Sequence, residues 1–225
     1  MAIPSTVVYF TIYDQLRENL TRKLNSRSIW IPIFSGGVAR TISVTVISPL
    51  ELIRTKMQSK KLSYFEIGTA IKSLVQSRGI FSIWHGIGPT LLRDVPFSCL
   101  YWANYEFLKK TFNQIEPSFT FSFFAGATAG SVSAVLTLPF DVVKTYKQIE
   151  LGEKVIEDNV NQKESKNRTT KDVLKRIYRE NGFRGLFSGI VPRVIKVAPA
   201  CAIMISTYEF SKAFFKQYNA SKRNK

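Results

Sequence analysis

The sequence predicts an all-α membrane protein, because several segments of membrane-spanning length are nearly free of charged residues. Residues 117–140 carry no charge, over a length comparable with the ~20 residues that a membrane helix needs. Residues 1–13 are also uncharged, and residues 28–50 contain one charge, Arg40. Residues 86–107 and 189–210 are apolar but hold internal charges. Hydropathy alone leaves a soluble protein with five core helices as an equal alternative, so the fold class depends on a second observation, an internal repeat.

The repeat is visible when the chain is aligned on Pro4, Pro96 and Pro199. Nine residues after each proline stands an aromatic residue, followed by an acid and, three residues later, a base. The acids and bases are Asp14 and Arg17, Glu106 and Lys109, and Glu209 and Lys212. Two segments that begin at Pro49 and Pro139 share the pattern proline-x-acid-x-x-base, and a glycine precedes each proline by thirteen residues. The chain is therefore two complete repeats preceded by the tail of a third.

The repeats define the expected elements in order. Residues 1–24 are the end of the first repeat, 25–115 the second, 116–216 the third, and 217–225 a basic tail. Each complete repeat reads as a long apolar helix broken near a proline, a polar stretch with a short helix at 65–75 or 171–178, and a second long helix. Helix kinks are expected at Pro4, Pro49, Pro96, Pro139 and Pro199. Residues 150–170 form a polar insertion to which we assign no chemistry.

The charge of the chain limits its partners and chemistry. A net charge of +16 indicates an anionic partner: nucleic acid, an anionic lipid surface or an acidic small molecule. The apolar spans and the lack of a recognised binding motif argue against nucleic acid. The sequence shows no nucleophile triad, metal cluster or phosphate loop, and its single histidine is His85. We therefore expect no enzyme, no catalytic residue, no cofactor and no metal site.

The segment Pro49-Leu-Glu51-Leu-Ile-Arg54-Thr-Lys56 fits the signature of the mitochondrial carriers, the solute carrier 25 family, which the chain resembles over nearly its whole length. The copy at 139–146 departs only in having Tyr146 at the last base. The resemblance implies the mitochondrial carrier fold of three pseudo-repeats, here with about five of six transmembrane helices, in the mitochondrial inner membrane. Since Met1 aligns with Arg93 and Lys196, we expect the first helix, the first loop and the start of the second helix to be missing, as in a fragment, an alternative start or an incomplete gene model.

Within the family, residues 46–58, 92–98 and 198–209 resemble the glutathione-carrier subfamily, members thirty-nine and forty. That resemblance implies import of glutathione by alternating access, and the family implies cardiolipin as a bound lipid. We expect a monomer that binds no nucleic acid. A carrier for another amino-acid-like solute, such as aspartate or glutamate, and a non-transporting membrane fragment or isoform remain as alternatives.

Ionisable residues inside the spans predict the substrate site, because charges within a membrane usually face a cavity or the bundle interior. Arg93 and Lys196 each lie three residues before an aligned proline, a level that contributes substrate contacts in carriers. Arg93 and Asp94 offer a cation and an anion for an amino-acid-like ligand, and Lys196 offers a cation for a second carboxylate. We do not expect Arg93 and Asp94 to neutralise each other, because adjacent residues on a helix do not face each other.

Two further arginines, Arg40 and Arg193, also lie within the apolar segments. Arg40 stands where the third repeat has Gly130, within a Gly126-x-x-x-Gly130 packing motif. A charge in place of a packing glycine indicates a substrate contact or, alternatively, an interhelical ion pair. Arg193 lies nearer the start of its helix, and we expect it to contact lipid phosphate.

The remaining charges predict two gates, in which an acid of one repeat meets a base of the next. Glu51, Arg54, Asp141 and Lys144 would form the matrix gate. Asp14, Arg17, Glu106, Lys109, Glu209 and Lys212 would form the cytoplasmic gate. Gly79 and Gly182 open short segments whose backbone N–H groups would bind lipid phosphate.

Overall fold

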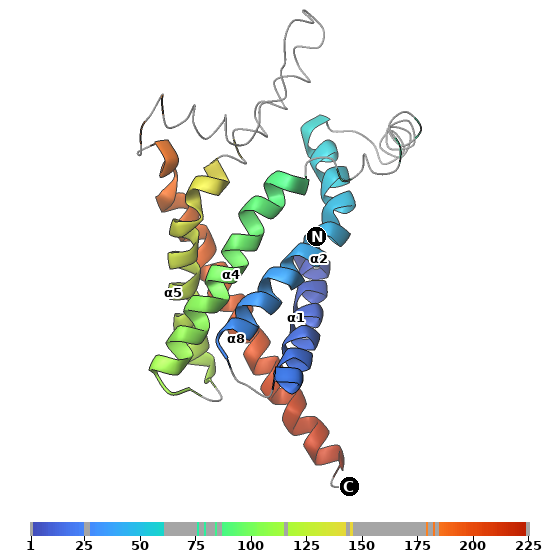
Figure 1. Cartoon of the computed structure of the whole chain (residues 1–225), viewed down its shortest axis with the longest axis vertical. Coiled ribbons are helices and arrows are strands. Elements are labelled where there is room, and N and C mark those ends of the chain that lie inside the picture. The colour runs from blue at the N-terminus through green and yellow to red at the C-terminus, as the bar shows by residue number, and fades with distance from the viewer. Residues whose placement is uncertain are drawn as a thin grey trace, which may run out of the picture. The chain divides into compact units, whose positions relative to one another are not determined.

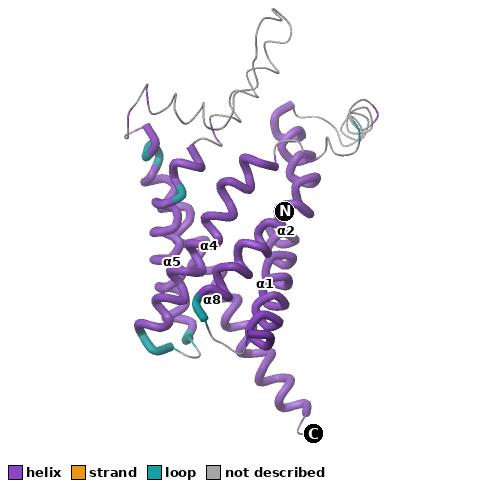
Figure 2. Tube along the Cα trace, in the orientation of Figure 1, coloured by secondary structure: helices purple, strands orange, loops and turns teal. Residues whose placement is uncertain are grey.

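The computed structural model describes residues 2–24, 28–60, 87–114, 117–142 and 185–223, with the single residues 76, 79, 84, 145, 179 and 182. For residues 2, 3, 51–60, 89 and 223 it describes the backbone only. The long helices are α1 (Ala2–Leu24), α2 (Trp30–Lys60), α4 (Ile87–Thr111), α5 (Phe119–Leu136) and α8 (Ile190–Arg223) (Figure 1). No strand occurs in the described residues (Figure 2), so the predicted all-α class is confirmed there.

Some sequence predictions fall outside the described residues. They are the short helices at 65–75 and 171–178, the insertion at 150–170, and the side chains of Glu51, Arg54 and Lys144. The side chains of three of the four residues predicted for the matrix gate are therefore not described, and that gate remains a prediction.

The prolines interrupt the helices less than the sequence suggested. Helix α2 runs through Pro49, α4 through Pro96 and α8 through Pro199 without ending. The break expected near Pro49 is therefore wrong. A proline removes one N–H donor and crowds the preceding turn, but the helical turns on either side continue.

The third repeat does contain a break, at Thr137, two residues before Pro139. Thr137 ends α5 with φ −94° and ψ 1°, and a further helical turn follows at residues 138–142. Its backbone N–H donates to the carbonyl of Ser133 at 3.0 Å, and its hydroxyl donates to the same carbonyl at 2.8 Å. Its carbonyl accepts from the N–H of Asp141 at 3.2 Å, so the interruption keeps its backbone groups paired.

The structure divides into two compact units, Met1–Pro96 and Phe97–Lys225, with the boundary inside α4. In unit 1, α1 and α2 pack in antiparallel directions. The hydroxyl of Ser43 donates to the carbonyl of Ser5 at 3.1 Å, and the indole N–H of Trp84 donates to the carbonyl of Thr45 at 2.8 Å. The Ser43 hydroxyl thus links α2 to α1, and the Thr45 carbonyl links α2 to Trp84.

In unit 2, α5 and α8 approach each other at glycines. A Cβ atom on Gly130 would lie 2.8 Å from Cβ of Cys201, and one on Gly126 would overlap the side chain of Ile205. Helices that pack through small residues can bring their backbones this close, as membrane helices often do. The predicted packing role of Gly126 and Gly130 agrees with these distances.

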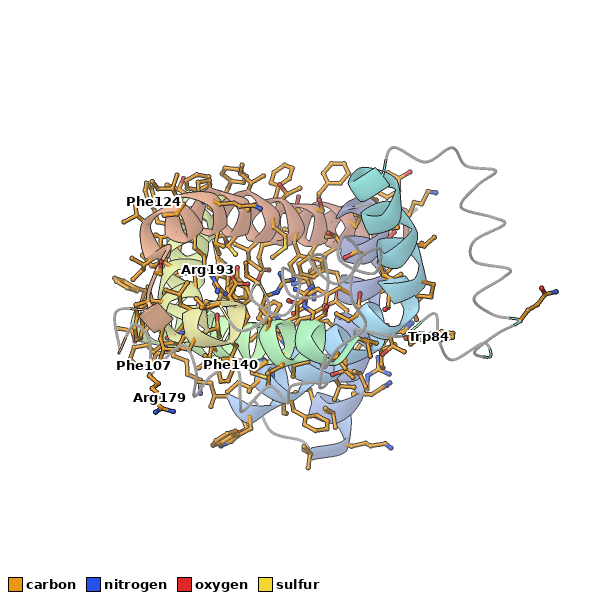
Figure 3. All side chains as sticks on the ribbon, turned by 90° about the horizontal axis from the view of Figure 1, so that it is seen from above. Trp84, Phe107, Phe124, Phe140, Arg179 and Arg193 are labelled. Atoms are coloured by element: carbon orange, nitrogen blue, oxygen red, sulfur yellow. The ribbon has the colours of Figure 1, made fainter. Side chains whose placement is uncertain are left out.

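The helices bury many small side chains and expose many large apolar ones. Buried positions hold many small or hydroxyl side chains, namely Ser35, Ala39, Ser43, Ser122, Ala129, Ser133, Ala134, Ala202 and Ser206. Large apolar side chains are exposed along the same helices, including Phe34, Val46, Phe124, Val132, Ile195, Ile203 and Phe214. In Figure 3, Phe107 and Phe124 project outward from unit 2 while Arg193 points inward.

This arrangement places apolar surface where lipid would lie. Soluble proteins rarely expose contiguous apolar surface on this scale, whereas lipid is as apolar as the side chains that face it. Three described segments, Trp30–Leu50, Phe119–Leu136 and Ile190–Lys222, are long and apolar enough to cross a membrane. These observations favour a membrane protein over the soluble alternative. Helices α1 and α4 fall outside that set because acids and bases interrupt them.

Candidate functional site

Arg93 and Asp94 lie on α4 and form an ion pair with each other. Nε of Arg93 donates to Oδ1 of Asp94 at 2.5 Å, so the expectation that adjacent residues would not pair is wrong. The long arginine side chain folds back along the helix, which backbone spacing alone does not forbid. The side chains are 34% and 19% exposed, and this leaves both groups accessible to a ligand.

Lys196 lies on α8 in unit 2, whereas Arg93 and Asp94 lie in unit 1. The lysine is exposed, three residues after Arg193 and three before Pro199. The structure therefore describes the predicted substrate residues in two separate units. Their common level is a prediction from the repeat.

Arg40 lies on α2 and stacks against an aromatic ring of α1. Its guanidinium carbon lies 4.3 Å from the ring centroid of Tyr9, and Tyr9 is 2% exposed. The Nε atom of Arg40 is buried and makes no hydrogen bond. The alternative of an interhelical ion pair is not observed, since Arg40 forms none with any described residue. The sequence did not indicate Tyr9, although an aromatic residue one turn before Tyr13 was the available signal.

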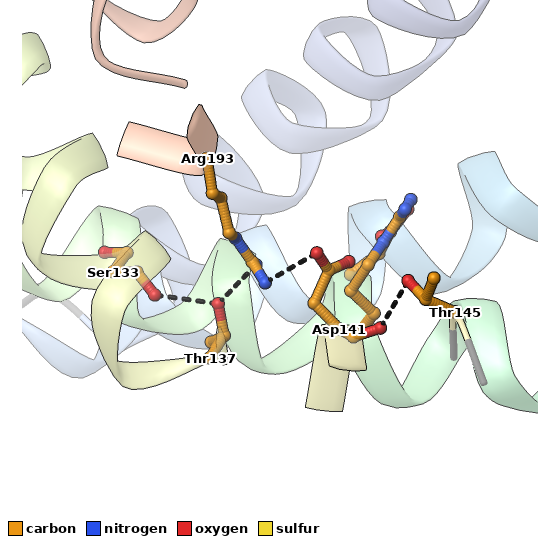
Figure 4. Close-up of polar contacts among 7 residues, drawn as sticks. Ser133, Thr137, Asp141, Thr145 and Arg193 are labelled. Atoms are coloured by element: carbon orange, nitrogen blue, oxygen red, sulfur yellow. Dashed lines mark hydrogen bonds and ion pairs between the residues drawn. The ribbon is translucent and has the colours of Figure 1, made fainter. Parts of the chain in front are cut away.

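Arg193 joins α8 to the break that follows α5 (Figure 4). One terminal nitrogen lies 3.0 Å from Oδ2 of Asp141, and the other donates to the hydroxyl of Thr137 at 2.9 Å. The arginine side chain is 11% exposed. Arg193 thus has an acid of the protein as its neighbour, as intramembrane cations usually do, and its contact with lipid phosphate stays a prediction.

The same contacts locate Asp141, which the sequence assigned to the matrix gate. Here Asp141 pairs within its own repeat, with Arg193. Thr137 was missed because a threonine in an apolar helix is unremarkable. The signal that could have found this cluster is the repeat alignment, in which Arg193 replaces Thr90.

The residues predicted for the cytoplasmic gate lie on the last long helix of each repeat, namely α1, α4 and α8. Nζ of Lys109 lies 3.8 Å from Glu106 and 3.9 Å from Glu209, and all three side chains are 11–13% exposed. The hydroxyl of Tyr105 donates to Glu209 at 3.4 Å. The structure thus brings together an acid and a base from different repeats, Glu209 and Lys109.

The other cytoplasmic bases contact the tyrosine that precedes their acid. Arg17 donates to the hydroxyl of Tyr13 at 3.4 Å, and Lys212 donates to that of Tyr208 at 3.2 Å. Asp14 lies on α1, between Tyr13 and Arg17 in the sequence. The aromatic residue of the repeated motif therefore holds the basic side chain one turn later.

The described groups combine fixed charges with an apolar exterior. Arg93, Asp94 and Lys196 can bind carboxylate and ammonium groups, and the motif charges can form reversible pairs at helix ends. Among the described residues, no three His, Cys, Asp or Glu side chains form a metal-binding group. Such an arrangement suits the binding and passage of a charged solute.

Comparison with known proteins agrees with this assignment. The chain matches the mitochondrial carrier protein family over residues 25–116 and 115–219. It is 55% identical over 226 residues to the mitochondrial glutathione transporter SLC25A40 of Danio rerio, covering 99% of the chain and 63% of that protein. It is 53% identical over 227 residues to the mitochondrial glutathione transporter SLC25A40 of Homo sapiens, covering 99% and 66%. It is 53% identical over 223 residues to the mitochondrial glutathione transporter SLC25A39 of Danio rerio, covering 97% and 62%.

The chain thus spans 62–66% of the length of these three relatives. The two family matches together cover most of its residues and coincide closely with the second and third repeats read from the sequence. The chain therefore belongs to the mitochondrial carrier protein family, whose members are multi-pass proteins of the mitochondrial inner membrane.

Proposed function

We propose that the protein carries a small zwitterionic or anionic metabolite across the mitochondrial inner membrane by alternating access, and that the metabolite is glutathione. The observation that supports glutathione as the substrate is the 53–55% sequence identity of the chain to relatives named mitochondrial glutathione transporters. Glutathione has two carboxylates and one ammonium group. Arg93, Lys196 and Asp94 would supply the matching charges.

Binding at Arg93 and Asp94 would exchange one set of ion pairs for another. In the structure the two side chains pair with each other at 2.5 Å. An amino-acid-like end of the solute would give Arg93 a carboxylate and Asp94 an ammonium group, so that neither side chain is left unpaired in a poorly solvated site. Breaking the internal pair lowers the net gain, and this suits a carrier that must also release its solute.

The gates in this proposal open and close by changing partners. Lys109 and Glu209 are 3.9 Å apart, at the long limit of an ion pair, and both would exchange this contact for other partners when the gate opens. On the matrix side, Asp141 would have to leave Arg193 in order to meet a base of a neighbouring repeat. Glu51, Arg54 and Lys144 would complete that gate.

Lipid contacts are proposed at the equivalent glycines Gly79 and Gly182. Both adopt positive φ, 80° and 59°, a conformation that side chains disfavour and that turns successive N–H groups toward one side. A Cβ atom on either would meet nothing within 4 Å, so conformation and not space requires glycine. We propose that cardiolipin phosphate binds there, and that the carrier acts as a monomer, without catalysis, a cofactor or nucleic acid.

A second candidate is transport of another amino-acid-like solute, which the paired charges of Arg93 and Asp94 would also fit. Uptake of radiolabelled glutathione, aspartate, glutamate and ADP into proteoliposomes separates the candidates, with protein-free liposomes as the control. Saturable glutathione uptake that excess unlabelled glutathione blocks would support the proposal. Saturable uptake of aspartate or ADP without glutathione uptake would overturn the substrate, and absence of any uptake would overturn transport by this chain.

A further inference from the structure

Arg40 is a cation in an apolar helix whose charge the described residues leave without an anion. Its Nε atom is buried without a hydrogen bond, and its guanidinium lies over the ring of Tyr9 at 4.3 Å. Arg40 forms no hydrogen bond and no ion pair with a described residue. The acids of unit 1 whose side chains are described are Asp14, Glu18 and Asp94, and none of them pairs with it. A ring face attracts the cation but supplies no hydrogen-bond acceptor for its N–H groups.

The repeat indicates that close helix packing does not require an arginine at this position. The equivalent residue in the third repeat is Gly130, where a Cβ atom would lie 2.8 Å from Cys201 and 3.8 Å from Cγ1 of Val197. Two helices can therefore pack closely at this position when the residue there has no side chain. In the second repeat the same position carries the longest cationic side chain, so the helices give up close contact to hold a charge there.

The depth of Arg40 also follows from the repeat. Gly130 lies beside Val197, the residue that follows Lys196. Asp94 is the residue equivalent to Val197 in the second repeat, where it follows Arg93. The backbone of Arg40 is thus expected at the level of the residues proposed to bind the solute, on a different helix.

We propose that Arg40, positioned by Tyr9, binds a carboxylate of the transported solute as a contact separate from Arg93, Asp94 and Lys196. The inference rests on the proposed function, a carrier of a small carboxylate-bearing solute. The ring of Tyr9 holds one side of the guanidinium, and the N–H groups at its rim remain able to grip a carboxylate with two hydrogen bonds. Arg40 remains partly exposed, so a solute can reach it.

The test compares solutes that differ by one carboxylate. The protein in detergent is titrated with glutathione and with two analogues, each with a different carboxylate converted to a carboxamide, and the midpoint of thermal unfolding is followed. Aspartate, glutamate and their monoamides, asparagine and glutamine, form a parallel set. The variants are Arg40→Gln, Arg40→Lys, Tyr9→Phe and Tyr9→Leu. Arg22→Gln is the control, because Arg22 pairs only with exposed Glu18 on the outer surface of α1.

We expect Arg40→Gln to weaken binding of the best acid by about tenfold or more, because a charge-assisted pair is lost. Binding of one of its monoamides should change little, so the preference for the acid over that amide disappears. Arg40→Lys should retain part of the preference, Tyr9→Phe should retain it, and Tyr9→Leu should reduce it. Arg22→Gln should behave as the unaltered protein.

Three outcomes would overturn the inference. They are equal weakening of acid and amides by Arg40→Gln, no stabilisation of the unaltered protein by any carboxylate, and an Arg40-dependent stabilisation produced by cardiolipin but by no solute. Failure of the substrate proposal is distinguishable. If aspartate or glutamate binds in an Arg40-dependent way while proteoliposomes take up no glutathione, the carboxylate contact stands and glutathione is the wrong substrate.

Discussion

The second and third repeats each carry an arginine at a position where the other repeat has an uncharged residue. In the second repeat the first helix, α2, carries Arg40, and the second helix, α4, has Thr90 at the position of Arg193. In the third repeat the first helix, α5, has Gly130 at the position of Arg40, and the second helix, α8, carries Arg193. Each repeat thus keeps one cation that the other lacks, and the surroundings of the two cations differ.

The difference concerns what neutralises each charge. Arg193 has an acid 3.0 Å away and a hydroxyl at 2.9 Å, and it ties α8 to the break at Thr137. Arg40 has an aromatic ring at 4.3 Å and no described acid. A cation that pairs with an acid of the protein stabilises the fold, whereas one held beside a ring is available to a solute. Repeats of one ancestry can therefore divide structural and binding duties between equivalent positions.

The largest expected effect is on transport and concerns the pair of equivalent residues Arg93 and Lys196. Arg93→Ala should reduce solute uptake to background, and Arg93→Lys should restore little of it, because a point charge does not reproduce a bidentate grip. Lys196→Arg should retain much of the activity, since it keeps the cation. Proteoliposome uptake per amount of reconstituted protein measures this, and normal uptake by Arg93→Ala would remove Arg93 from the substrate site.

The next effect is on stability and concerns Arg193 and Thr90. Arg193→Ala should lower the free energy of unfolding by about 3 kcal/mol, the low end for breaking a buried pair, because Asp141 is 31% exposed. Removing both partners in Arg193→Ala with Asp141→Ala should cost less than removing one. Thr90→Val, at the equivalent position, should cost less than about 1 kcal/mol. Denaturant unfolding in detergent compares the three, and equal losses for Arg193→Ala and Thr90→Val would contradict the structural role of Arg193.

Exchanging Arg40 and Gly130 tests the comparison directly. Gly130→Leu should destabilise the protein by about 1–3 kcal/mol through overpacking against Cys201, and Gly130→Arg should do at least as much. Arg40→Gly should lower the free energy of unfolding by only about 1 kcal/mol, the usual cost of glycine inside a helix, while solute binding weakens. A strong loss of stability in Arg40→Gly together with unchanged binding would make Arg40 a structural residue.

The smallest effects concern the tyrosines of the repeated motif. Tyr105→Phe removes a hydrogen bond of 3.4 Å to Glu209, and Tyr13→Phe removes one of 3.4 Å from Arg17. Each should cost about 0.5–1.5 kcal/mol at most, the usual value of a single hydrogen bond. Because Tyr105 contacts Glu209, an acid of another repeat, Tyr105→Phe should also change the transport rate. Equal transport rates for the two variants would place Tyr105 outside the gate.

Much of the fold was predictable because it depends on local pattern. Uncharged stretches such as residues 117–140 are helical wherever backbone groups must be satisfied without water, and the motif beginning at Pro49 recurs at fixed offsets. The continuity of α2 through Pro49 was not predictable, because a proline is compatible with either a bend or a break, and the packing around it decides.

The sequence by itself determined the repeats, the helices and the family, and it identified the charges that stand within apolar spans. Only the tertiary structure decided the partners of those charges: Asp94 for Arg93, Tyr9 for Arg40, and Asp141 with Thr137 for Arg193. The physical reason is range. Helical periodicity follows from neighbours within one or two turns, whereas the partner of a charge depends on its side-chain rotamer and, for Arg40 and Arg193, on distances of a few ångströms between different helical segments.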